Sequence, residues 1–90
     1  TPEQRAAAVC VPRSLEAVRA AVAAGEHDPV RLQSVGRNAV AAQPRARWEH
    51  LEFVDSRTLR HVEQVLGDGS VVAVTAVWFG DVRLIDNCLL

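Results

Sequence analysis

The sequence predicts an α+β domain in which N-terminal helices pack on a small three-stranded antiparallel sheet. The spacing of the apolar residues carries this prediction, because it follows the helical period up to about residue 42 and a period of two from Trp48 onward. The composition agrees, since 49% hydrophobic and 23% charged residues in a chain of 90 are typical of one small folded domain. We therefore expect residues 1–90 to form a single domain.

The first helical segment has a clear beginning and end. Its opening, Thr1-Pro2-Glu3-Gln4, combines a capping residue, a proline at the first helical position and a glutamine three residues after the cap. An alanine-rich stretch follows until Gly25, which supplies a C-terminal stop. Pro12 interrupts this stretch, and a proline inside a helix costs roughly 3 kcal/mol. We expect either a kink there or two helices, over about 2–10 and 13–24.

A second helix is predicted from Asp28-Pro29 to about Ala42. The aspartate caps it and the proline suits its first turn. Gly36 lies inside this helix, where it costs about 1 kcal/mol relative to alanine. We interpret Gly36 as the position that lets the preceding helix approach closely.

The third segment, from Trp48 to Val54, has the alternation of a strand with one buried face. Its residues divide into two sets: Trp48, His50, Glu52 and Val54 point one way, and Leu51 and Phe53 point the other. Residues 55–58 are typical of a turn, and residues 59–66 are expected to be partly irregular.

The last third of the chain predicts a β-hairpin. Residues 71–79 are rich in valine and form the clearest strand, and Gly80-Asp81 is a two-residue connection of the type II′ kind. Residues 82–89 return antiparallel, with Phe79 opposite Val82, Trp78 opposite Arg83, and Val77 opposite Leu84. In this register Arg83 is expected to lie on the Trp78 ring.

The charge of the chain is divided unevenly. Residues 1–47 hold seven Arg against four acidic residues, a net of +3, and residues 48–90 hold three Arg against seven acidic residues, a net of −4. The total of −1 lacks the basic excess of a nucleic-acid binder. No apolar run approaches the roughly 20 residues that cross a bilayer, and no signal-peptide pattern is present. We expect a cytoplasmic chain without nucleic-acid or membrane partners, and the lack of Met indicates processing or a piece of a longer protein.

No self-contained active site is predicted. Gly67-Asp68-Gly69-Ser70 lacks the lysine and the following helix of a phosphate-binding loop and is interpreted as a turn. Cys10 and Cys88 match no metal or redox spacing, so two reduced, buried thiols are favoured, with a disulfide between the two ends as the alternative. The three histidines are too scattered to predict a metal site: His27, His50 and His61. We assign no catalytic, cofactor-binding or metal-binding residue.

Four residues of the hairpin are candidates for a structural role or for contact with another domain. Trp78 and Arg83 face each other across it. Asp86 and Asn87 lie in an apolar segment, where buried polar side chains need partners. Fixing the last strand against the helices is the favoured role for this pair, and an interface with a further domain is the alternative.

Four segments resemble, in order and in spacing, parts of the pantothenate synthetases. Residues 1–8 are similar to the segment that follows the Ser-Ser-Arg-Asn loop of that family. Residues 24–28 resemble its helix-to-helix junction, and residues 54–59 resemble its Asp-x-x-Thr-Leu turn. The most specific likeness is residues 76–87, which are similar to the closing hairpin with its Arg-Leu-Ile-Asp-Asn ending.

The resemblance implies the C-terminal domain of a cytoplasmic, homodimeric ligase. Pantothenate synthetases join pantoate to β-alanine with ATP and Mg²⁺, through an enzyme-bound pantoyl adenylate. In that family a Rossmann-like N-terminal domain, absent from this chain, holds the nucleotide with a His-x-Gly-His-type motif and a lysine, and the C-terminal domain covers the cavity as a lid. None of those catalytic residues falls on these 90 positions, so the fragment alone is expected to be inactive.

Two other functions stay open from the sequence. The chain could be a free-standing binding or dimerisation module without enzymatic purpose. It could also belong to a paralogous ligase that joins a different acid and amine.

Overall fold

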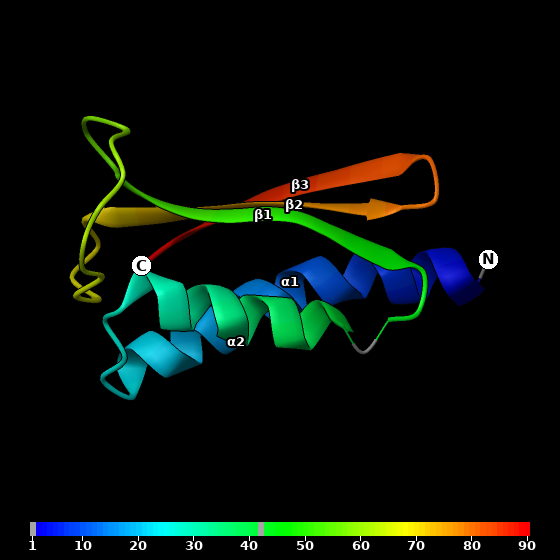
Figure 1. Cartoon of the computed structure of the whole chain (residues 1–90), viewed down its shortest axis with the longest axis horizontal. Helices are drawn as coiled ribbons and strands as arrows, with labels where there is room; N and C mark the ends of the chain where they lie inside the picture. The colour runs from blue at the N-terminus through cyan, green and yellow to red at the C-terminus, as the bar shows by residue number, and fades with distance from the viewer. Residues whose placement is uncertain (1, 42) are drawn as a thin grey trace.

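The computed structural model describes residues 2–41 and 43–90, without the side chains of residues 3, 4 and 6–8. Helices α1 (Pro2–Ala23) and α2 (Pro29–Ala41) pack against each other and against one face of a sheet (Figure 1). The sheet contains β1 (Ala46–Asp55), β2 (Val71–Phe79) and β3 (Val82–Leu89), antiparallel in the order β1-β2-β3. The predicted α+β arrangement is confirmed.

Helix α1 runs without interruption through Pro12, which is exposed. Of the two alternatives predicted at Pro12, two separate helices is therefore wrong: one continuous helix contains the proline. The capping box predicted from Thr1 and Gln4 lies outside the described residues and side chains. Neither helix within residues 2–41 combines the length and apolar character that crossing a bilayer requires.

The junction between the two helices has the predicted caps. Gly25 has φ +102°, and its N–H donates to Val22 O while Glu26 N–H donates to Ala21 O, both at 3.0 Å. This pair of bonds is the Schellman motif that ends a helix at a left-handed glycine. At the start of α2, Val30 N–H donates to Asp28 Oδ1 at 2.9 Å, as an N-cap requires.

Gly36 allows α2 to approach both α1 and the sheet. A Cβ atom at this position would lie 2.6 Å from Leu51 Cδ2, 3.2 Å from Ser14 Oγ and 3.3 Å from Val18 Cγ2. Ser14 is fully buried and donates its hydroxyl to Gly36 O at 2.8 Å, which links the helices. The predicted close approach of the helices is confirmed, and β1 shares in it.

The core lies between the helices and the sheet in two clusters. The larger one joins side chains of both helices, β1, β2, the connection after β1 and the residue that follows β3: Leu15, Val18, Val22, Leu32, Leu51, Phe53, Val65, Val71, Ala73 and Leu90. The smaller one contains Cys10, Val11, Val40 and Val77. Residues 56–70 form no helix or strand apart from a single bridge at His61, as predicted, yet Val65 is fully buried.

Strand β1 contains a bulge that the alternation did not predict. Trp48 pairs with Val77 and His50 with Ala76, so Glu49 is an extra residue without a partner on β2. An extra residue reverses the alternation of a strand. Trp48 therefore packs with Leu51 and Phe53 against the core, and its predicted place on the face of His50 is wrong.

The hairpin has the predicted register, with Phe79 opposite Val82, Trp78 opposite Arg83 and Val77 opposite Leu84. Gly80 has φ +57°, as the first central position of the predicted turn requires. This register places Trp78 and Arg83 side by side on one face of the sheet.

Candidate functional site

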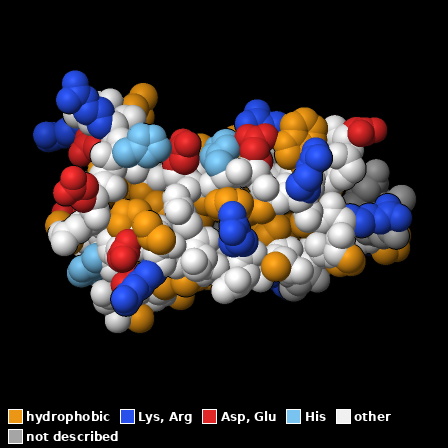
Figure 2. Space-filling view, in the orientation of Figure 1, with side chains coloured by type: hydrophobic (Ala, Val, Ile, Leu, Met, Phe, Trp, Pro, Cys, Tyr) orange, Lys and Arg blue, Asp and Glu red, His pale blue; other side chains and the backbone are white. Residues whose placement is uncertain are grey.

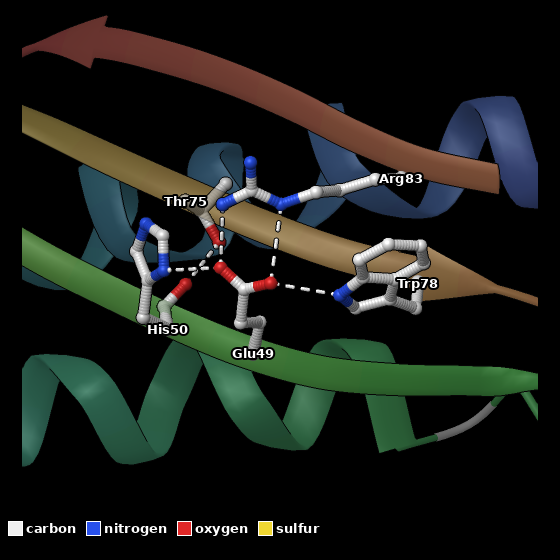
Figure 3. A network of polar contacts seen from close by, with 5 residues as sticks. All are labelled: Glu49, His50, Thr75, Trp78 and Arg83. Atoms are coloured by element: carbon white, nitrogen blue, oxygen red, sulfur yellow. Dashed lines mark hydrogen bonds and ion pairs between the residues drawn. The ribbon is translucent and has the colours of Figure 1, made fainter. Parts of the chain in front are cut away.

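The Glu49 carboxylate is the centre of a polar network on the sheet face that points away from the helices (Figure 3). Trp78 Nε1–H donates to Oε1 at 2.7 Å, and Arg83 donates from Nε to Oε1 at 3.1 Å and from Nη2 to Oε2 at 2.6 Å. His50 Nδ1 lies 2.9 Å from Oε2. Because Glu49 is the bulge residue, its side chain can reach donors on both other strands.

These donors keep Glu49 ionised. The hydrogen bonds from Arg83 and Trp78 lower the pKa of Glu49 from an ordinary 4.5 to about 2. The same carboxylate raises the pKa of Arg83. A carboxylate that is ionised and bonded in this way is a poor general acid or base at neutral pH, so the network fixes side chains in place.

Arg47 contributes the cation that lies over the Trp78 ring. Its Cζ atom is 5.7 Å from the ring centroid. The predicted stacking of Arg83 on Trp78 is wrong, because the charged hydrogen bonds to Glu49 draw the Arg83 guanidinium toward β1. Trp78 and Arg83 are therefore linked through the Glu49 carboxylate, which accepts hydrogen bonds from both.

The bulge is held from beneath by Thr75. Its side chain is fully buried and its hydroxyl donates to His50 O at 2.8 Å. Thr75 belongs to β2 and His50 to β1, so this bond joins two strands beside the irregular step of the ladder. It fixes the backbone that presents Glu49.

Asp86 and Asn87 do not share one environment. Asp86 is half-buried on the helix-facing side, and its Oδ1 accepts the N–H of Asn87 at 2.8 Å. Asn87 is exposed, so the expectation that both would be buried is wrong for Asn87. Alternation along β3 directs Asn87 to the face that carries Arg83.

A groove of about 410 Å³ runs between α2 and β1. Figure 2 shows hydrophobic side chains along this part of the surface. Arg37 lies over the Trp48 ring at 4.5 Å, and Gln33 Nε2 donates to Leu51 O at 2.9 Å. Within the described residues the Trp48 indole N–H is buried without a partner. Both bases and acids line the groove, which gives it no strong preference for one sign of ligand charge.

The cysteines are both free. Burial raises the pKa of the Cys10 thiol, as expected of an inert structural residue. Cys88 is only half-buried, and Arg19 Nη2 lies 3.0 Å from its Sγ. No group of three His, Cys, Asp or Glu side chains among the described residues could hold a metal ion.

Glu49 is the site residue that the sequence prediction missed. The signal was present: Trp48 and Leu51 are three positions apart, a spacing that cannot put both on one face of a regular strand. A bulge between them restores both to the core and turns Glu49 outward.

The comparisons with known proteins agree with one another. The family model described as Pantoate-beta-alanine ligase matches residues 1–89. The Pantothenate synthetase of Chloroflexus aggregans is 41% identical over 90 residues, which are 100% of this chain and 32% of that protein. The Pantothenate synthetase of Acidobacterium capsulatum is 41% identical over 88 residues, which are 98% of this chain and 29% of that protein.

Solved structures give the same match in three dimensions. A crystal structure of the pantothenate synthetase from Thermus thermophilus superposes with a TM-score of 0.84 at 28% identity, over 99% of this chain and 31% of that one. The chain therefore spans about a third of the length of the relatives it matches.

Proposed function

The chain belongs to the pantoate-beta-alanine ligase family, and from that membership we propose that it is the C-terminal lid domain of a pantothenate synthetase. The whole protein would condense pantoate with β-alanine at the expense of ATP, through a pantoyl adenylate, as a cytoplasmic homodimer. The observation that carries the proposal is a match over the full 90 residues that accounts for only 32% of the relative. A domain of a larger ligase fits this better than a free-standing module.

The proposed work of this domain is to exclude water from the reaction. An acyl adenylate is readily hydrolysed, so a cover over the cavity protects the intermediate until the amine attacks. We assign ATP and Mg²⁺ to the part of the enzyme outside these residues, because the family resemblance implies that the nucleotide-binding motifs lie there. The positive charge of residues 1–47 suits a surface near an anionic nucleotide.

The test compares the full-length enzyme with a form that lacks residues 1–90 and with the 90-residue chain alone. Pantoate-dependent ATP–pyrophosphate exchange reports adenylate formation. The ratio of AMP to pantothenate reports how much intermediate is lost to water. The 90-residue chain should show no exchange, and the form without it should release AMP in excess of pantothenate, provided that it still binds ATP.

Two results would contradict the proposal. Robust exchange by the 90-residue chain would place the chemistry within it. If a folded enzyme without this domain had an unchanged AMP-to-pantothenate ratio, the domain would not act as a cover over the reaction. A full-length enzyme that forms an amide only from another acid or amine would still be a ligase, but its substrates would differ from those proposed.

A further inference from the structure

Strand β1 lies at an edge of the sheet, and this edge is covered along only part of its length. Near the end of the strand the chain itself covers it: Val62 N–H donates to Phe53 O at 3.1 Å, and Asp55 N–H donates to Arg60 O at 2.8 Å. Over residues 46–52 no described strand pairs with β1 on this side. An open edge of this kind presents N–H and C=O groups that have no strand to bind.

The groove between α2 and β1 lies along this open part of the edge. Helix α2 runs beside the strand and forms the other wall (Figure 1). The strand contributes five consecutive residues, 48–52. Successive side chains of a strand point to opposite faces, so the feature that these five share is the backbone edge. The helix contributes residues at spacings that place them on one of its faces. They are Val30, Gln33, Ser34 and Arg37.

Gln33 shows how the strand edge faces the groove. Its Nε2 donates to Leu51 O at 2.9 Å, so the side-chain amide stands where a peptide N–H of an added strand would donate. The preceding carbonyl, His50 O, accepts the Thr75 hydroxyl from the side of β2 instead. In an antiparallel ladder a residue exchanges its N–H and its C=O with the same neighbouring strand. The N–H of Leu51 therefore faces the groove together with its carbonyl.

Two further donors of the groove have no acceptor. Trp48 Nε1–H is buried and finds no partner among the described residues, although buried polar groups normally have one. Arg37, whose Cζ lies 4.5 Å from the centre of the Trp48 ring, forms no ion pair with another described residue. An extended peptide beside β1 would bring carbonyl acceptors along the groove, and it could place an acidic side chain beside Arg37.

We propose that this groove binds an extended peptide of a partner protein, which adds to β1 as a further strand at residues 48–52. Peptide-binding domains recognise strands in this way, with affinity from main-chain hydrogen bonds at a sheet edge and specificity from side-chain pockets. Five residues of a strand span about 17 Å, so the bound segment is about five residues long. Its chemistry is an apolar residue against Val30, which is 69% exposed, and an acidic residue beside Arg37.

The groove suits a single peptide strand better than a second copy of the chain. A copy that paired through its own β1 would bring its own α2 into the space beside the first helix. The volume of about 410 Å³ is large enough for a short segment and too small for a folded domain. A peptide backbone is neutral and carries both donors and acceptors, which suits a groove lined by both bases and acids. The proposal does not depend on ligase activity.

The test is peptide binding by the full-length protein, measured by fluorescence anisotropy without substrates. The probes are labelled pentapeptides, blocked at both ends, in which valine and threonine alternate and one aspartate takes each position in turn. Each peptide is also made with alternate amides N-methylated, in one set or in the other. Only one set faces β1 in a bound strand, because neighbouring N–H groups point to opposite edges. We expect that set to weaken binding at least tenfold and the other set to weaken it much less.

Variants locate the bound peptide. Ser34 lines the groove and is exposed, so Ser34→Trp should fill the groove and weaken binding at least tenfold. Ala20→Trp is the matched control, because it places the same bulk at an exposed position of α1 that does not line the groove. It should change binding less than twofold. Arg37→Ala should remove the preference among the aspartate positions. Circular dichroism checks that each variant folds.

Several results would overturn the proposal. Equal weakening by both N-methylated sets would show that main-chain hydrogen bonds to the edge do not hold the peptide. Unchanged binding by a folded Ser34→Trp would place the peptide elsewhere. A full-length protein that binds no peptide of the panel and protects the Leu51 amide from hydrogen exchange would assign the groove to a segment of its own chain. Ligase activity is assayed separately, so peptide binding by an inactive protein contradicts only the proposed function.

Discussion

Arg83 and Glu49 join the two edge strands of the sheet across the central one. Arg83 belongs to β3 and Glu49 to β1, and they meet through an Nε–Oε1 contact of 3.1 Å and an Nη2–Oε2 contact of 2.6 Å. Trp78, on the strand between them, donates to the same carboxylate. All three strands are therefore tied together at one point near the hairpin.

This network predicts a pH-dependent contribution to stability. The folded pKa of Glu49 is about 2, below the ordinary 4.5. A depressed carboxyl pKa stabilises the fold fully above the unfolded value, and this stabilisation is lost as the pH falls from about 4.5 toward 2. Glu49→Gln should thus lower the free energy of unfolding at pH 7, and its difference from the wild type should shrink at pH 3, as measured by urea denaturation.

Glu63→Gln is the matched control for this measurement, because Glu63 is exposed and lies outside the network. It should change stability little at either pH. A deficit of Glu49→Gln that is constant between pH 7 and pH 3, or that grows in acid, would contradict the proposed role of the carboxylate.

The hairpin was predictable from sequence because its causes are local. Gly80-Asp81 sets the turn, and the turn sets the register that places Trp78 opposite Arg83. The Schellman end at Gly25 was predictable for the same reason.

The network around Glu49 was not predicted, because it depends on an irregular ladder and on partners distant in sequence. Glu49 and Arg83 are 34 positions apart. Period-two reasoning assumes a regular strand, and one extra residue was enough to turn Trp48 from the outer face to the core. Val65 was missed for a related reason, since a buried residue in an irregular connection follows no period.

Gly36→Ala should destabilise the domain although alanine is the better helix former. The gain in helix propensity is about 1 kcal/mol. The new Cβ would meet Leu51 Cδ2 at 2.6 Å, and Leu51 is only 1% exposed, so it has little room to move. Overpacking of this kind costs about 1–3 kcal/mol. Urea denaturation should show a net loss, with Asn38→Ala, at an exposed position of α2, as the control that gains helix propensity without a buried contact. A more stable Gly36→Ala would show that the helices can separate freely.

Thr75→Val should weaken the fold by about 1 kcal/mol, because it removes the buried hydrogen bond to His50 O while keeping the shape of the side chain. Thermal unfolding measures the loss. Ser34→Ala is the control, since that hydroxyl is exposed and its bond to Val30 O is long, at 3.4 Å. An unchanged melting temperature for Thr75→Val would mean that the bond adds nothing to the bulge.

Pro12→Ala should stabilise the domain. Helix α1 continues through Pro12, so the proline leaves the carbonyl four residues earlier without its helical donor and crowds it with the ring, at a cost of about 3 kcal/mol in a regular helix. Proline also restricts the unfolded chain, which offsets roughly 0.4–1 kcal/mol of that cost.

Pro12 is exposed, so its replacement opens no cavity. A net gain of about 2 kcal/mol would raise the melting temperature by roughly 8–16 °C in a domain of this size. Arg13→Ala, at the next position, which is also exposed, should leave it nearly unchanged. A lower melting temperature for Pro12→Ala would show that the proline is needed where it stands, for the path that α1 takes along the sheet.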